Sequence, residues 1–291
     1  MKYIKNLLTA GLTLAVAIAV SAQSPRKLDF GFNFAATAQH VDVDDDGYTY
    51  VAGLFENSET FGTFTLNSNG GTDVFVLQID QTGAIIDAVS FGGPEFETVN
   101  DIHADENGTI YLVGTFMGSV DFDPNDVTDF IIDGSTIGSD GYVVNLNAEL
   151  GFEWAGSIGG DGIENITGVA TGPFPDYYVY ITGMFSDGAD LAPLDTETQI
   201  ENTTGLSGFF VKVDHHGALQ WTKTVSNGNE VYGTGVTVDF AGNPVFIGIY
   251  TGTVNINPDG TEDLTGVGDS DIFILKLNTL YWRIRIINQP A

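Results

Sequence analysis

The chain has 291 residues, a formal net charge of −30 at pH 7 and no cysteine. This charge argues against nucleic acid and anionic lipid as partners, since both are negative, and the lack of cysteine excludes disulfides and a lipid anchor on cysteine. Aromatic residues make up 12% of the chain, in short alternating runs between glycine, aspartate and asparagine. This pattern is typical of an all-β protein and not of a glycine-rich disordered chain.

Residues 1–22 have the pattern of a secretory signal peptide. Lys2 and Lys5 precede the apolar run Leu7–Val20, and Ser21 and Ala22 are small residues suited to cleavage before Gln23. The alternative is a retained anchor, but a membrane span needs about 20 apolar residues and this run is shorter. We expect a chain that is secreted or displayed at the cell surface, without membrane insertion after signal cleavage.

Residues 23–280 repeat one unit, with a period of about 65 residues. Its first phrase predicts a hairpin, two β-prone runs joined by an acidic turn, as in Val99–Phe116. The copies of this hairpin close on a glycine, at Gly53, Gly114, Gly183 and Gly248. Two further strand phrases follow, as in Gly71–Asp80 and Ala84–Gly93. Phrases that share one period indicate a repeat protein.

Each unit therefore supplies four short antiparallel strands, which is the composition of a β-propeller blade. Blades of this kind bury their faces by stacking on their neighbours. Trp154 and Trp221 occupy matching places in the fourth strand, and we expect them to pack between blades. The sequence predicts an all-β fold, a β-propeller of about four four-stranded blades.

Two interpretations of the ring stay open. Residues 28–35 resemble a lone fourth strand, which would complete the last blade and close a small ring. Residues 281–291 form an atypical tail, because Arg283 and Arg285 crowd into it while basic residues are scarce elsewhere. Such a tail suggests a truncation or frameshift, and it favours a chain that is part of a larger propeller.

The phrases together resemble the SBBP repeats, the seven-bladed β-propeller repeat family of bacterial secreted and surface proteins. The matching residues are Gly71–Asp80, Trp154, Trp221, Gly92–Gly93, Gly159–Gly160 and Asp105–Gly114. The resemblance extends over residues 28–280. It implies a propeller in an exported protein, and it implies no particular activity.

The turn of the first hairpin is a candidate calcium site. Asp42, Asp44 and Asp46 precede Gly47 with the spacing that opens a calcium-binding loop. The bidentate glutamate that would complete the loop is missing, because Gly53 stands there. An ordinary hairpin turn is the alternative that we favour.

A second candidate calcium site follows the hairpins of the second and fourth units. The shared pattern is an oxygen ligand, an apolar residue, a second oxygen ligand and proline. Its members are Asp121, Asp123 and Asn125 in the second unit, and Asn255, Asn257 and Asp259 in the fourth. These residues could hold Ca²⁺ between strands, or they could cap a turn that proline fixes, which is the interpretation that we favour.

Catalytic chemistry has no comparable signal. The four histidines, His40, His103, His215 and His216, lack zinc spacing. The sequence favours a non-enzymatic binding or structural module whose partner is an extracellular protein or polysaccharide. The alternative is a propeller-fold carbohydrate-active enzyme, a lyase or glycosidase, with its site at the mouth of the central channel. The first strands would line that mouth and place there Asp42, Asp101, His103, Thr237 and Asp239.

Overall fold

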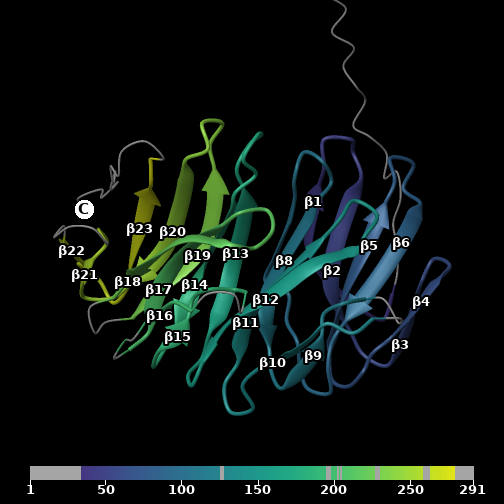
Figure 1. The fold of residues 1–291 in the computed structure, drawn as a ribbon, viewed down its shortest axis with the longest axis horizontal. Helices are drawn as coiled ribbons and strands as arrows, with labels where there is room; N and C mark the ends of the chain where they lie inside the picture. The colour runs from purple at the N-terminus through teal and green to yellow at the C-terminus, as the bar shows by residue number, and fades with distance from the viewer. Residues whose placement is uncertain are drawn as a thin grey trace, which may run out of the picture. The chain divides into compact units, whose positions relative to one another are not determined.

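A computed structural model gives the fold of the chain (Figure 1). It describes residues 34–124, 128–194, 198–201, 203, 205–226, 230–257 and 263–278, which all belong to one compact unit. The expected signal peptide and tail lie outside these ranges. The described residues are all β, with antiparallel strands and no helix. In these residues no helix is long and apolar enough to cross a membrane.

The strands form four main sheets that follow one another along the chain (Figure 1). The first sheet contains, in spatial order, β1 (Thr37–Val43), β2 (Thr49–Phe55), β5 (Asp73–Ile79) and β6 (Ile85–Phe91). The second contains β7 (Asp101–Ala104), β8 (Ile110–Phe116), β11 (Asp140–Leu146) and β12 (Phe152–Gly160). The third contains β13 (Asn165–Thr171), β14 (Val179–Phe185), β17 (Ser207–Val213) and β18 (Leu219–Val225). The fourth contains β19 (Val231–Val238), β20 (Pro244–Tyr250) and β23 (Asp271–Lys276).

A short hairpin is inserted between the second and third strands of each sheet. These hairpins are β3–β4 (Ser58–Phe61 and Phe64–Asn67), β9–β10 (Ser119–Asp121 and Ile131–Asp133), β15–β16 (Ala189–Asp190 and Ile200–Glu201) and β21–β22 (Thr253–Asn255 and Asp263–Thr265). The sequence phrases did not predict them, because two to four residues per strand are too few for a visible alternation.

The recurring closing glycines have a steric cause. A Cβ atom at Gly114 would stand 2.0 Å from the Thr98 carbonyl oxygen, and one at Gly183 would stand 2.0 Å from the Asn165 carbonyl oxygen. In the first, third and fourth sheets a register shift in the first strand lies opposite this glycine or next to it. The glycine therefore lets the two backbones of the hairpin approach closely.

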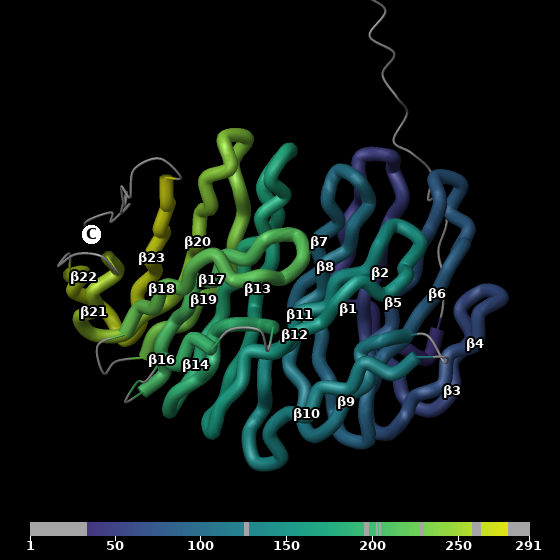
Figure 2. Tube along the Cα trace, in the orientation of Figure 1, coloured from purple at the N-terminus to yellow at the C-terminus, as the bar shows by residue number. Residues whose placement is uncertain are grey.

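The sheets pack face to face in chain order. Their first strands β1, β7, β13 and β19 are neighbours in succession, as Figure 2 lets the reader follow. The third strands β5 and β11 are buried along their whole length. A neighbouring sheet covers each face of β11, whereas one face of β5 packs against residues of the β3–β4 hairpin, such as Phe61 and Phe64. Trp154 is 9% exposed within the core between the second and third sheets, and its indole Nε1–H donates to the His215 carbonyl at 3.0 Å. The expected packing role of this tryptophan is confirmed.

Two of the inserted hairpins reach back to the preceding sheet. In β15, Ala189 and Asp190 pair with Gly160 and Gly159 at the end of β12. Asp121 in β9 forms a single bridge to Gly92, directly after β6. Each of these two hairpins therefore continues the outer edge of the sheet before its own.

The first and fourth sheets differ from the inner two in exposure. Val41 in β1 is 63% exposed, whereas Ile102 at the matching position of β7 is 5% exposed against the first sheet. On the fourth sheet, Ile247 and Ile272 are 46% and 73% exposed. In the described part of the chain no strand pairing joins the fourth sheet to the first.

The all-β prediction and the succession of antiparallel hairpins are confirmed. The strand inventory differs from the prediction because each unit holds an additional hairpin. The fourth sheet has three strands within the described residues, in keeping with the lack of a fourth strand phrase at the end of the last unit. The predicted lone strand at residues 28–35 falls mostly outside those residues, and Ala35 is not in a strand.

Candidate functional site

The turn end of the sheets is built by one recurring cap. An aspartate or asparagine side chain accepts a hydrogen bond from the backbone N–H four residues on, as Asp44 does from Tyr48 at 2.9 Å and Asp105 does from Thr109 at 2.9 Å. The same bond recurs at Asp80, Asn147, Asp214 and Asp239. Much of the acidity of the turns therefore stabilises backbone geometry.

One loop at this end departs from the rule. The turns between the first two strands span residues 44–48, 105–109 and 239–243, but the third sheet uses residues 172–178, two more than the others. The longer loop closes through the Gly172 N–H, which donates to the Tyr178 carbonyl at 2.8 Å. Within it Phe174 is 71% exposed, and its ring centroid lies 5.8 Å from that of Tyr177.

Tyr177 is held in an unusual position. Its φ of 42° lies in the left-handed region, which is unfavourable for a bulky side chain. The hydroxyl donates to Glu106 Oε1 of the neighbouring sheet at 2.8 Å. The loop is thereby tied to the second sheet, and the ring is fixed between two hollows.

The two hollows lie on either side of Tyr177. One, of about 390 Å³, is lined by Trp154, His215, His216 and the amide side chains Asn107 and Asn147. The other, of about 300 Å³, is lined by residues of all four main sheets, among them Asp45, His103, Thr171 and Asp239. Both also have Tyr177 and Asp105 in their walls. Together they form a wide, shallow surface in which aromatic rings and other apolar groups are mixed with polar side chains, and which we call the turn-end surface.

A polar series crosses the first strands at the smaller hollow. Asp42 Oδ2 lies 3.2 Å from His103 Nδ1, and His103 Nε2 lies 2.9 Å from Thr171 Oγ1. The three residues come from β1, β7 and β13. A carboxylate, an imidazole and a hydroxyl thus stand in the order that nucleophilic hydrolases use.

The two aspartates of this region differ in electrostatics. Burial acts to raise the pKa of Asp42, but hydrogen bonds from His103 and from the backbone N–H groups of Ala104 and Val43 bring it below its ordinary value. Burial raises the pKa of Asp101, and the N–H of Val169 offsets part of that effect. Asp42 therefore stays ionised beside the imidazole at neutral pH.

The acidic triad of the first turn is divided among separate partners. Asp42 faces His103, and Asp44 is a turn cap that also accepts from the Tyr50 hydroxyl at 3.1 Å. The backbone carbonyl of Asp46 accepts from Gln81 at 2.8 Å. These contacts agree with the hairpin-turn interpretation, and calcium at Asp42, Asp44 and Asp46 stays a prediction.

The second acidic motif begins at the last residue of the first strand of an inserted hairpin, Asp121 in β9 and Asn255 in β21, and continues into the turn. Asp121 Oδ1 accepts from the N–H groups of Asp123 and Phe130, at 3.1 Å and 2.8 Å. Asn255 Oδ1 accepts from the Asn257 N–H at 2.9 Å. Both motifs therefore act as turn caps, while Asn125 and Asp259 lie outside the described residues. Calcium at Asp121, Asp123, Asn255 and Asn257 stays a prediction.

No group of three or more histidine, aspartate or glutamate side chains is arranged to hold a metal ion in the part of the chain that the structure describes. Of the residues expected at the mouth, His103 and Asp239 line the smaller hollow. Asp239 also pairs with Lys276 of β23. Thr237 lies in β19 outside the lining residues of that hollow.

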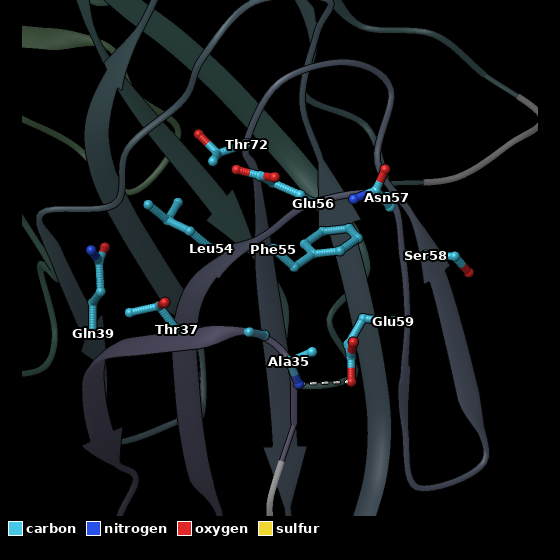
Figure 3. A pocket seen from close by; sticks show the side chains of 11 residues that line it. Ala35, Thr37, Gln39, Leu54, Phe55, Glu56, Asn57, Ser58, Glu59 and Thr72 are labelled. Atoms are coloured by element: carbon cyan, nitrogen blue, oxygen red, sulfur yellow. Dashed lines mark hydrogen bonds between the residues drawn. The ribbon is translucent and has the colours of Figure 1, made fainter.

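A third hollow, of about 420 Å³, lies beside the first sheet (Figure 3). Phe55 stands in its middle, and Glu59 Oε1 accepts from the Ala35 N–H at 3.2 Å. Ser58 corresponds to Ser119, whose carbonyl oxygen closely faces Gly93 of the preceding connection. In a later repeat the connection from the preceding sheet lies at the equivalent place. The hollow is therefore explained by the position of the first sheet in the chain and gives no evidence for a ligand-binding site.

Sequence reasoning missed Phe174 and Tyr177. The available signal was the looser third copy of the hairpin phrase, in which Pro173-Phe-Pro-Asp-Tyr177 replaces a short acidic turn. It also missed Thr171 as a partner of His103, because the two residues are far apart in the chain.

Comparison of the chain with protein-family models finds no model that matches. Comparison with curated proteins finds no relative either.

Proposed function

We propose that this chain is a secreted or cell-surface repeat protein of the β-propeller type, related to the SBBP repeats, that binds a neutral polysaccharide without catalysis. The turn-end surface is the proposed binding site. The observation that carries the proposal is the longer loop Gly172–Tyr178, which places the Tyr177 ring between the two hollows and the exposed Phe174 ring beside it.

The loop fits the way repeat proteins acquire binding sites. An insertion in one repeat of an otherwise regular array maps to a loop on one face, which is often the binding face. Phe174 is too exposed to serve the core, and the strained backbone of Tyr177 is a cost that folding alone does not require. Both features support a role in recognition.

The chemistry of the surface suits sugars. Aromatic rings offer flat apolar faces to the C–H face of a pyranose, and amide and carboxylate groups such as Asn107, Asn147 and Glu153 can bind hydroxyl groups. The net charge of −30 repels anionic polymers. A neutral polysaccharide is therefore favoured over an acidic one.

Affinity electrophoresis of the purified chain in gels that contain neutral or acidic polysaccharides tests the proposal. We expect retardation by at least one neutral polymer, and about a 5- to 30-fold loss of affinity in Tyr177→Ala and Phe174→Ala, since a lost stacking contact costs about 1–2 kcal/mol. Phe96→Ala is the matched control, because Phe96 is also exposed, at 61%, but lies in a connection at the opposite end of the sheets.

Retardation that is equal in Tyr177→Ala, Phe174→Ala and wild type would overturn the site. Binding of an extracellular protein, with no polysaccharide bound, would overturn the ligand class. Export is tested separately by N-terminal sequencing of protein from a bacterial culture medium or outer surface, where we expect Gln23 as the first residue.

The second candidate function is a carbohydrate-active enzyme, and the Asp42–His103–Thr171 series is the observation that favours it. His103 would accept the Thr171 proton as the Thr171 oxygen attacks an ester carbonyl of an acylated polysaccharide, while Asp42 orients the imidazole; the sugar hydroxyl leaves with that proton, and water then releases the acid from Thr171. Release of acetate from an acetylated polysaccharide by wild type, lost in Thr171→Val and His103→Gln, would support this candidate. Equal rates in wild type and both variants would remove it.

A further inference from the structure

Two pairs of carboxyl groups are buried where one sheet meets the next. Asp73, at the start of β5, is 1% exposed and Glu97, before β7, is 1% exposed. Asp140, at the start of β11, is 6% exposed and Glu164, before β13, is 0% exposed. Neither pair belongs to the turn-end surface, and neither was singled out by sequence reasoning.

Backbone hydrogen bonds set each pair side by side. The Glu97 N–H donates to the carbonyl of Thr72, the residue before Asp73, at 3.0 Å. The Glu164 N–H donates in the same way to Ser139, the residue before Asp140, at 2.8 Å. The two interfaces therefore repeat one arrangement.

Several oxygen atoms of these pairs have no hydrogen-bond partner. Among the described residues, no donor reaches Glu97 Oε1, Asp140 Oδ1, Glu164 Oε1 or Glu164 Oε2. Glu97 Oε2 accepts from the Gly93 N–H at 3.1 Å, and Asp140 Oδ2 accepts from the Ser135 N–H at 3.2 Å. Buried carboxylate oxygens without a partner are costly and rare, so each pair requires either a proton or a cation.

Paired glycines leave room beside the aspartates. A Cβ atom at Gly92 would stand 2.3 Å from Asp73 Cγ, and one at Gly159 would stand 2.6 Å from Asp140 Oδ2. The offsets along the chain are equal, because Gly92 follows Asp73 by 19 residues and Gly159 follows Asp140 by 19 residues. Glycine is therefore needed for the approach of the carboxylate.

The third interface has lost the whole set at once. Ser207 in β17 takes the place of the aspartate, and Val231 in β19 takes the place of the glutamate, with its N–H donating to Leu206 at 3.1 Å. Ser226 and Asn227 take the places of the two glycines. The four positions thus change together, as the parts of one site would.

The electrostatics agree with this geometry. Burial raises the pKa of Glu97 to about 7, and the charges of Asp73 and Glu95 add to the rise. Burial also raises the pKa of Glu164 to about 7, where the charges of Asp140 and Asp187 add to it. The N–H groups of Ser186 and Gly160 approach Glu164 without reaching hydrogen-bond geometry.

We propose that each of these two interfaces binds a divalent cation of the calcium type, held between Asp73 and Glu97 in the first site and between Asp140 and Glu164 in the second. Two carboxylates balance the charge of one such ion. Calcium takes six to eight oxygen ligands and accepts carbonyl, hydroxyl and water oxygens for the rest. Two carboxylates per site predict the weak binding of extracellular modules, with a dissociation constant of about 10⁻⁴ M.

The test begins with the full chain stripped by chelator and dialysed against radioactive Ca²⁺ at pH 7.5. We expect two bound ions per chain for wild type, one for Glu97→Gln, one for Glu164→Gln and none for the double variant. Glu230→Gln is the matched control, because Glu230 is an exposed carboxylate next to Val231 at the third interface. The melting temperature of wild type should rise by about 5 °C per site in millimolar Ca²⁺.

Terbium luminescence gives an optical readout of both sites. The Tyr142 hydroxyl donates to the carbonyl of Thr98, next to Glu97, at 2.8 Å. Tyr142 also follows Asp140 by two residues in β11, so the two side chains lie on one face of that strand. Terbium in either site should therefore be excited through Tyr142. We expect Tyr142→Phe to lose most of the tyrosine-excited emission while two ions stay bound.

Three results would overturn the proposal. The first is no bound Ca²⁺ and no change in melting temperature for wild type. The second is bound Ca²⁺ that Glu97→Gln and Glu164→Gln leave unchanged but Asp121→Asn removes, which would move the ion to the hairpin turns. The third is a chain that acid stabilises and Ca²⁺ does not, which would show a shared proton in each pair.

Discussion

The three interfaces between successive sheets share one backbone hydrogen bond, but the first two bury carboxyl groups beside it and the third buries uncharged side chains. The first two place an aspartate and a glutamate face to face, whereas the third places Ser207 opposite Val231. The backbone bond that joins the sheets there is present in all three cases. The fold therefore does not need the acids, and their retention as a complete set points to a task beyond packing.

The largest expected effect is the pH dependence of stability in chelator. Glu97 and Glu164 have folded pKa values of about 7, above the unfolded value of about 4.3. Between these values the folded state holds more protons than the unfolded state, so stability is greatest near pH 4–5 and falls as pH rises to about 7. The loss is about 3 kcal/mol per glutamate.

Urea unfolding at pH 5 and pH 8 in chelator measures this loss. The third interface contributes nothing to it, since Ser207 and Val231 do not titrate. The double variant Glu97→Gln with Glu164→Gln should lose most of the pH dependence in this window. A wild-type free energy of unfolding that rises between pH 5 and pH 8 would contradict the buried acid pairs.

A smaller loss of unfolding free energy is expected when a glycine that faces a buried aspartate is substituted. Gly159→Ala forces a Cβ atom against Asp140 Oδ2 and should cost about 1–3 kcal/mol of unfolding free energy. Ser226→Ala, at the matching position of the third interface, should change stability by less than about 0.5 kcal/mol. Chemical denaturation of both variants at pH 7.5 compares them. Equal costs would show that the glycines serve the strand end and not the carboxylate.

The smallest expected loss of unfolding free energy comes from removing single hydrogen bonds between neighbouring sheets. This loss should be similar at the two interfaces and should not depend on pH. Thr167 Oγ1 donates to the Gly233 carbonyl at 2.7 Å between the third and fourth sheets, and Asn100 Nδ2 donates to the Ile166 carbonyl at 2.8 Å between the second and third. Thr167→Val and Asn100→Ala should each cost about 1 kcal/mol, the usual contribution of such a bond. A pH-dependent cost in either variant, measured by urea unfolding at pH 5 and pH 8, would contradict this assignment.

The repeat, the strand type and the turns could be predicted from the sequence. The period and the turn-forming Asp-x-x-Gly steps are local signals, and a local hydrogen bond such as that of Asp44 to Tyr48 is what they encode. The inserted hairpins could not be predicted, because strands as short as Ala189–Asp190 owe their pairing to the end of β12 and not to their own residues.

The candidate sites were predicted less well for a related reason. Acidic spacing drew attention to Asp42, Asp44 and Asp46, yet in the fold these residues have separate partners. The buried pair Asp140 and Glu164 is separated in the sequence by strand, turn and strand, and neither residue stands out from the other acids of the chain. Only the packing of one sheet on the next brings the two carboxyl groups together.

The reach of two inserted hairpins, β9–β10 and β15–β16, to the preceding sheet bears on how such a chain can gain or lose repeats. The repeating unit of the sequence and the unit that completes a sheet edge do not begin at the same place, since β15 pairs with β12 of the unit before. Recombination that removes one whole period leaves such a hairpin next to an equivalent strand end. Removal of a hairpin alone leaves a strand edge open to pairing with another molecule. The offset thus makes the whole period the natural step of genetic change.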